Sequence, residues 1–203
     1  MWACDYAPTD RTKGLLADVL YQTKVRSAAD ALYMAHVAIE QSRLEAYAKP
    51  VLTLLQARCR DEIGVISFGT SNANPSLWHR YGGEDYGVCV EVEVANDLIG
   101  TQLREVTYQD RKSLHIDQVL EASLDGGDAA SVFQVALLTK PLRWRSECEF
   151  RFLSKKQNVS IKLNASPIRS ITLGRALTSE IVSEVRDIVA NLDYSLEVRD
   201  AKA

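Results

Sequence analysis

The residues best suited to chemistry lie in the run 140–151, which reads KPLRWRSECEFR. The end of this run alternates charged and apolar side chains, as a half-buried β-strand does. The alternation predicts that Glu147, Glu149 and Arg151 share one face of a strand. Side chains two positions apart on a strand are separated by about 6.5 to 7 Å. Two carboxylates at that separation can flank one small ligand, although they are too far apart to share a proton. The alternative is a solvated strand face that carries an ordinary ion pair.

Five further side chains form the predicted ligand-binding set. Ser67 and Thr70 follow a second predicted strand, where hydroxyls can bond a flat ligand lying against the backbone, or can simply complete a turn. Trp78 and Tyr81 offer a stacking surface, although their spacing of three on a short helix is also that of a core face. Lys140, with two arginines shortly after it, is suited to binding pyrophosphate, whereas such cations are also commonly solvated.

The composition argues against several classes of protein. Four cysteines and three histidines are scattered singly, which favours neither a disulfide scaffold nor a metal centre. The net charge of −3 and the pI near 5.7 give no general attraction to nucleic acid. No run of about 18 apolar residues is present. We therefore expect a soluble, cytoplasmic protein with no metal, no membrane partner and no strong nucleic-acid signal.

Hydrophobic periodicity divides the chain into helices first and strands second. We expect helices over residues 12–21, 27–47 and 50–59, two helices within 112–138 on either side of the turn at 125–127, a brief helix over 76–81, and a last helix over 178–189. We expect strands over residues 64–68, 88–94, 103–108, 147–153, 160–163, 168–173 and 194–198, with a hairpin turn at 154–158 and an edge position for the last strand.

This order predicts an α+β fold, in which a helical N-terminal third precedes a mixed, mainly antiparallel β-sheet flanked by helices. The length of 203 residues fits a single domain over 1–203. Its helical portion would cover residues 1–60 and its sheet-containing portion residues 61–203.

A series of short motifs resembles the bacterial DUF2971 family, a domain of unknown function. The motifs, in order, are Val65-Ile66-Ser67-Phe68, Leu77-Trp78-His79-Arg80-Tyr81, Gly87-Val88-Cys89-Val90, Val106-Thr107-Tyr108, Lys140 and Glu147-Cys148-Glu149-Phe150-Arg151. Members of that family carry a strand ending in Ser-Phe, a W-x-x-Y helix, a G-V-C-V-type strand, a V-x-Y strand, and a lysine followed by E-x-E-[FW]-R. The resemblance extends from about Ile63 to the end of the chain.

One part of the family pattern is absent. Its members begin with a strand of H-Y-T type, whereas this chain begins Met1-Trp2-Ala3-Cys4-Asp5. The resemblance implies either a shortened domain or a start further upstream. A missing strand would leave an unpaired sheet edge, and we expect a homo-oligomer in which another copy covers that edge.

The family layout is similar to that of ADP-ribosyltransferases, which implies a nucleotide ligand, with NAD as the substrate. Cleaving the nicotinamide glycosidic bond builds positive charge on the ribose, and a fixed carboxylate stabilises that charge. In this hypothesis Glu149 faces the ribose, Glu147 is the base for the acceptor, Ser67 is the strand-end hydroxyl, and Arg151 keeps Glu149 ionised. It predicts that NAD binding is lost in Glu149→Gln, or appears only when an upstream strand is restored.

Two other functions stay open. The first is a metal-dependent nucleic-acid processing enzyme, in which Glu147, Glu149 and Lys140 surround a divalent ion. The second is a non-catalytic interaction domain of a phage-defence or toxin system, in which the E-x-E-F-R face binds a partner.

Overall fold

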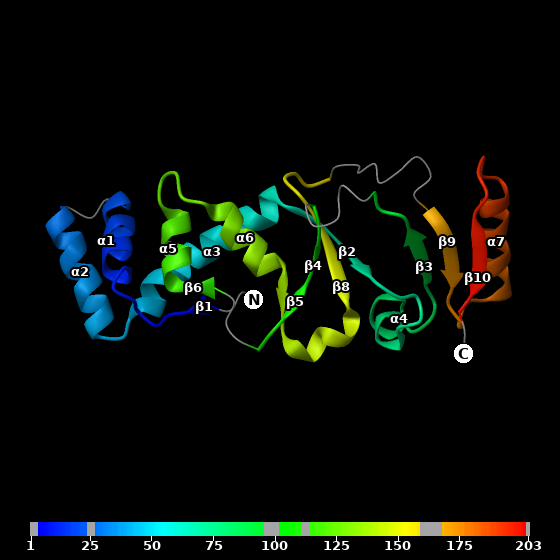
Figure 1. Ribbon diagram of the computed structural model, residues 1–203, viewed down its shortest axis with the longest axis horizontal. Coiled ribbons are helices and arrows are strands. Elements are labelled where there is room, and N and C mark those ends of the chain that lie inside the picture. Colours follow the sequence, from blue (N-terminus) through cyan, green and yellow to red (C-terminus); the bar gives the residue numbers. More distant parts are fainter. Residues whose placement is uncertain (1–3, 24–26, 96–101, 111–113, 159–167, 202–203) are drawn as a thin grey trace. The chain divides into compact units, whose positions relative to one another are not determined.

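The structure is a computed structural model that describes residues 4–23, 27–95, 102–110, 114–158 and 168–201. Its elements are N-terminal helices followed by several small mixed and antiparallel sheets with helices between them, so the predicted α+β class is confirmed (Figure 1). The chain divides into two compact units. Unit 1 consists of residues 1–63 and 107–142, and unit 2 of residues 64–106 and 143–203. Whether the whole chain acts as one domain stays a prediction.

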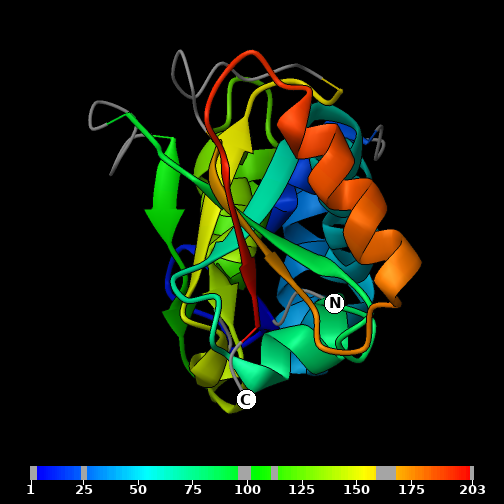
Figure 2. The ribbon, with the colours of Figure 1, turned by 90° about the vertical axis from the view of Figure 1, so that its right-hand side faces the viewer.

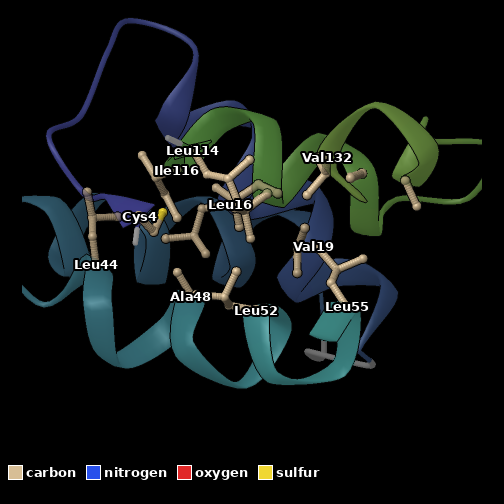
Figure 3. Packing of buried hydrophobic residues seen from close by; sticks show 14 of the residues in the cluster. Cys4, Leu16, Val19, Leu44, Ala48, Leu52, Leu55, Leu114, Ile116 and Val132 are labelled. Carbon is tan, nitrogen blue, oxygen red and sulfur yellow. The ribbon is translucent and has the colours of Figure 1, made fainter. Parts of the chain in front are cut away.

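Unit 1 is mainly helical. Its helices are α1 (Thr12–Gln22), α2 (Ala28–Glu40), α3 (Leu44–Glu62), α5 (Ile116–Ser123) and α6 (Ala129–Leu137). Two short parallel strand pairs accompany them, β1 (Cys4–Asp5) with β6 (Leu114–His115) and β5 (Thr107–Tyr108) with β7 (Thr139–Lys140). Leucine, valine and alanine side chains from the five helices form a common core, as Figure 3 shows for Leu16, Leu52, Leu55 and Val132.

The boundary between α2 and α3 differs from the predicted one. We expected a helix to reach residue 47 and a new one to begin at Pro50, but α2 ends at Glu40 and α3 runs through Pro50. The end of α2 is a Schellman motif, because Ser42 has a φ of 53°, its N–H donates to the Ile39 carbonyl, and the Arg43 N–H donates to the Ala38 carbonyl. Glycine usually occupies that left-handed position, and a serine there gives little signal in the sequence.

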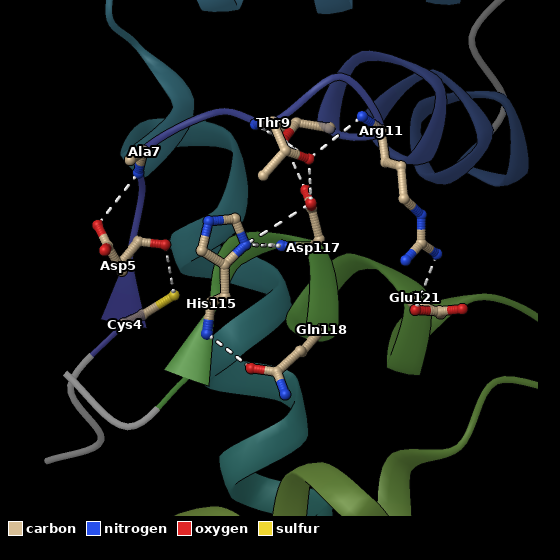
Figure 4. A network of polar contacts seen from close by, with 10 residues as sticks. Cys4, Asp5, Ala7, Thr9, Arg11, His115, Asp117, Gln118 and Glu121 are labelled. Atoms are coloured by element: carbon tan, nitrogen blue, oxygen red, sulfur yellow. Dashed lines mark hydrogen bonds and ion pairs between the residues drawn. The ribbon is translucent and has the colours of Figure 1, made fainter.

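A polar network fastens the chain before α1 to the start of α5 (Figure 4). The Asp117 carboxylate accepts hydrogen bonds from the hydroxyls of Thr9 and Thr12, the latter at 2.5 Å. The His115 side chain caps α5 by accepting from the Asp117 N–H, while Gln118 accepts from the His115 N–H. Thr12 and Asp117 are both buried, whereas Thr9 and Gln118 are exposed, so the network runs from the core of unit 1 to its surface.

Cys59 in the core of unit 1 makes stability depend on pH. Burial, helped by the nearby Glu62 carboxylate, raises the pKa of its thiol to about 11. The thiol of an unfolded chain ionises near pH 8.5, so the stabilisation is complete below about pH 8.5 and is lost as the pH rises toward 11. In the parent protein the free energy of unfolding should fall as the pH rises, and we expect Cys59→Ala to reduce this fall by up to about 2 kcal/mol, measured by urea unfolding. Cys148→Ala, at an exposed cysteine, is the matched control for removing a thiol. The same alkaline loss in Cys59→Ala and in the parent protein would contradict this assignment.

Unit 2 contains two three-stranded sheets. The first is antiparallel, in the order β2 (Gly64–Gly69), β8 (Glu149–Ser154) and β4 (Leu103–Glu105). The second has the order β10 (Glu197–Asp200), β9 (Ile168–Leu173) and β3 (Val88–Val92), in which β3 is antiparallel and β10 parallel to β9. Helix α7 (Ser179–Ala190) runs alongside β9 and β10 (Figure 2), and Arg186 pairs with Asp200 at 3.4 Å. Helix α4 (Pro75–Tyr81) and most of the 3-10 helix η2 (Leu142–Glu147) complete the unit.

The strand predicted over 103–108 is two strands that serve different sheets. Its first half is β4, which pairs with β8 in unit 2, and its second half is β5, which pairs with β7 in unit 1. Val106 lies between them with its side chain buried and its N–H donating to the Glu149 carbonyl. The last strand is an edge strand as predicted, but it covers Glu197–Asp200. The predicted strand 160–163 lies outside the described residues.

Candidate functional site

The start of β8 differs from the predicted strand over 147–153, so the prediction that Glu147, Glu149 and Arg151 share one strand face was partly wrong. β8 begins at Glu149, whereas Glu147 ends the 3-10 helix η2. Cys148 between them has a φ of 45°, and its N–H donates to the Arg145 carbonyl, which breaks the expected alternation. Glu149 and Arg151 do share one strand face. Glu147 therefore does not lie on that face with them.

Each of the two carboxylates is buried and faces an arginine. Glu149 is 6% exposed and accepts a bidentate ion pair from Arg151, with Nε–Oε1 at 2.7 Å and Nη2–Oε2 at 3.1 Å. Glu147 is 3% exposed, and its Oε1 lies 2.9 Å from Nη1 of Arg80. The Arg80 guanidinium in turn stacks on the Trp144 ring, 3.8 Å from its centroid. These contacts tie α4 to η2 and hold the start of β8, so this is not the solvated strand face of the alternative interpretation.

A cavity of about 760 Å³ lies within unit 2. Four of the five predicted ligand-binding residues line it, namely Ser67, Thr70, Trp78 and Tyr81. The fifth, Lys140, belongs to β7 in unit 1. Glu147, Glu149 and Arg151 are not among the described residues that line the cavity.

Local hydrogen bonds shape the loop at the cavity wall. Asn74 caps α4 by accepting from the Ser76 N–H, and its own side-chain amide donates to the Ser146 carbonyl at 2.6 Å. The buried Trp78 donates from Nε1 to the Asn72 carbonyl at 2.7 Å. Trp78 therefore acts mainly as an anchor of the loop. Tyr81 is largely exposed and remains available for stacking.

The first sheet contributes aromatic and aliphatic side chains to the lining. Phe68 and Phe150 lie directly opposite each other on β2 and β8, and Leu103 comes from β4. Side chains opposite each other in an antiparallel pair point to the same face, so the two phenyl rings form one surface. That surface suits a flat ring more than a small ion.

The second sheet contributes valine side chains of β3 as well as polar side chains to the same cavity. Glu91 and Arg199 line the cavity and form an ion pair with each other. Oε2 of Glu91 accepts a hydrogen bond from Arg199 Nη1 at 3.2 Å and another from Ser170 Oγ at 2.5 Å. The loop residue Asn72 donates to Thr172 Oγ1 at 3.0 Å. These residues were missed at the sequence level. The alternation over 88–94 places Cys89 and Glu91 on one face, but it does not say which way that face points.

Cys89 also lines the cavity, yet it is poorly suited to act as a nucleophile. Burial, with a contribution from the Glu91 carboxylate, raises the pKa of its thiol. The thiolate is the reactive form of cysteine, so a raised pKa leaves the side chain protonated at neutral pH. The cavity thus offers hydroxyls, an amide, aromatic rings and one carboxylate–guanidinium pair.

Comparisons of the chain with protein-family models, with curated proteins and with solved structures found no match. The resemblance to the DUF2971 family therefore stays a prediction. Among the helices that the structure describes, none combines the length and apolar character needed to cross a membrane. Within the same described ranges, no three histidine, cysteine or acidic side chains are grouped as metal ligands.

Proposed function

We propose that unit 2 binds a nucleotide in its cavity, that the nucleotide is NAD, and that the protein is an ADP-ribosyltransferase-like enzyme. The observation that supports this most is the convergence of Ser67, Thr70, Trp78 and Tyr81, chosen from the sequence for ligand binding, on one cavity. They come from the end of β2 and from α4, and each had an ordinary structural alternative.

The size and chemistry of the cavity fit such a ligand. A volume of about 760 Å³ falls within the range of roughly 300 to 1,000 Å³ typical of small-molecule sites. Phe68 and Phe150 provide a surface for a planar base, and Thr70 and Asn72, in the loop after β2, provide hydrogen-bonding groups. A mixed aromatic and polar lining matches a molecule that combines rings, sugars and phosphates.

In this proposal Glu149 and Arg151 act on the site through β2. Their positions in β8 are paired directly with Gly69 and Ser67, the residues that carry β2 into the cavity wall. The ion pair between them fixes the strand that presents Ser67. Both are therefore proposed as positioning residues, and the direct contact with NAD is assigned to the side chains that line the cavity.

The test is calorimetry with NAD on the full chain and on a variant whose cavity is filled. Thr70→Trp should abolish the heat of NAD binding, because an indole in the lining occupies the space of a base. Thr53→Trp, on an exposed position of α3 in unit 1, is the matched control and should bind like the parent protein. Transfer of label from NAD to a protein acceptor should likewise be seen with the parent protein and Thr53→Trp and be lost in Thr70→Trp. Absence of binding to the parent, or equal binding by Thr70→Trp, would overturn the proposal.

The second candidate is the non-catalytic interaction domain. β2 and β3 are edge strands of their sheets among the described residues, and Val65, Ile66, Val88 and Val90 on them are exposed. Edge strands with exposed apolar side chains are suited to pairing with another chain. A protein that binds no NAD but self-associates in sedimentation would favour this candidate and the predicted homo-oligomer.

A further inference from the structure

We propose that Glu91 and Arg199 are the charged anchor of the ligand, with the Glu91 carboxylate accepting hydrogen bonds from a ribose diol and the Arg199 guanidinium binding a phosphate. This inference rests on the proposed function and specifies which groups of the same cavity recognise the nucleotide.

The Glu91 side chain is held by hydrogen bonds to one of its two carboxylate oxygens. Glu91 on β3 is paired with the fully buried Ser170 on β9, and Ser170 is paired in turn with Glu197 on β10. Ser170 and Arg199 both donate to Oε2 of Glu91. No described residue donates to the other carboxylate oxygen, Oε1. One oxygen therefore fixes the side chain, and the other keeps its capacity to accept.

Arg199 is held by two glutamates, Glu91 and Glu197. Its Nη2 donates to Glu197 at 2.5 Å while its Nη1 donates to Glu91. A guanidinium carries five N–H donors, so these two bonds leave others for a ligand phosphate. The contact with Glu197 also raises the pKa of Arg199, which keeps the positive charge in place.

Glu91 and Arg199 are the charged residues among the described residues that line the cavity. Arg199 offsets the negative charge of Glu91, so the pair does not repel an anionic nucleotide as a lone carboxylate would. A carboxylate oxygen prefers donors, and a ribose diol supplies two of them. A phosphate on the ribose 2′-oxygen would instead bring two negative groups together. The pair should therefore favour NAD over its 2′-phosphorylated form, NADP.

A second glutamate–arginine pair of the same unit provides a matched control. Glu93 follows β3 and pairs with Arg169 of β9, and both side chains are about half exposed, as are those of Glu91 and Arg199. Neither Glu93 nor Arg169 is among the described residues that line the cavity. Changes at this second pair alter the charge of the unit equally but should not affect the ligand.

The experiment is calorimetry of NAD and NADP against the full chain and four variants. Glu91→Gln should weaken NAD binding by about tenfold and reduce the preference for NAD over NADP, since an amide accepts less strongly and does not repel a phosphate. Arg199→Met should weaken both nucleotides. Glu93→Gln and Arg169→Met should stay within about twofold of the parent. Thermal unfolding of each variant reports whether it is folded.

The outcomes separate this inference from the proposed function. Normal NAD binding by the parent, with Glu91→Gln indistinguishable from Glu93→Gln, would overturn the role of the anchor and leave the nucleotide site standing. A preference for NADP in the parent would also overturn it. Failure of the parent to bind either nucleotide would remove both proposals together.

Discussion

Replacing Arg151 by methionine is expected to lower the free energy of unfolding by about 3 to 5 kcal/mol, which is the range for breaking a buried ion pair by removing one partner. The Glu149 carboxylate, which is 6% exposed, would lose a bidentate guanidinium at 2.7 and 3.1 Å. Methionine preserves most of the side-chain volume, so the loss reports the charge rather than a cavity. Urea unfolding followed by tryptophan fluorescence suits the measurement, because Trp78 and Trp144 both belong to unit 2.

The control for this variant is an exposed ion pair of the same unit. Arg186 and Asp200 lie 3.4 Å apart with both side chains more than half exposed. Arg186→Met should change the free energy of unfolding by no more than about 0.5 kcal/mol. Equal effects of the two substitutions would show that the pair in β8 is not structural. A Glu149→Gln change added to Arg151→Met should restore part of the loss, because it removes the charge left behind.

The second large effect is expected at Asp117 in unit 1. Its carboxylate accepts from the hydroxyls of both Thr9 and Thr12, so Asp117→Ala deprives two hydroxyls of their acceptor, one of them fully buried. We expect the free energy of unfolding to fall by about 2 to 4 kcal/mol. Urea unfolding monitored by the helical circular-dichroism signal measures this loss. The network also fastens the segment before α1 to α5, so the variant should expose that segment to proteolysis (Figure 4).

Asp128 gives the comparison for Asp117. It caps α6 with a single hydrogen bond from the Ser131 N–H to its Oδ1, at 3.2 Å, and it is exposed. Asp128→Ala should cost about 1 kcal/mol, the usual value for a lost helix cap. An Asp117→Ala variant no less stable than Asp128→Ala would contradict the importance of the network.

Local sequence rules predicted the elements whose determinants are local. Ser27, Asn74 and Thr178 cap α2, α4 and α7, and each accepts from a backbone N–H in the first turn of its helix. The regular alternation over 88–94 gave β3 for the same reason, although the strand ends at Val92. Where hydrogen bonds join residues near in sequence, the pattern carried enough information.

Predictions failed where a backbone conformation or a pairing partner decides the structure. Ser42 and Cys148 adopt positive φ values, which serine and cysteine rarely do. As a result, α2 ends earlier than expected and β8 begins later than expected. Val106 lies between β4 and β5, which pair with β8 and β7 respectively. The position of the break between β4 and β5 is therefore determined by these partners and not by residues 103–108. Non-local pairing is not encoded in the period of a single strand.

The candidate site shows the same division. Ser67, Thr70, Trp78 and Tyr81 come from two adjacent elements joined by a short loop, so their convergence was accessible from the sequence. Glu91 and Arg199 are 108 positions apart and meet only because β9 lies between β3 and β10. The alternation alone gave Glu91 no more weight than Glu147 or Glu149. Burial and pairing with arginine distinguish the latter two as structural groups.

Hydrogen exchange of the full chain with and without NAD is the sharpest test of nucleotide binding in the cavity, because it reports where NAD binds without any substitution. We predict slower exchange at the backbone amides of residues 67–72 and 88–92, which line the cavity, and no change at α1 and α2 of unit 1. Unchanged exchange in both cavity segments at saturating NAD, or protection confined to unit 1, would contradict this prediction.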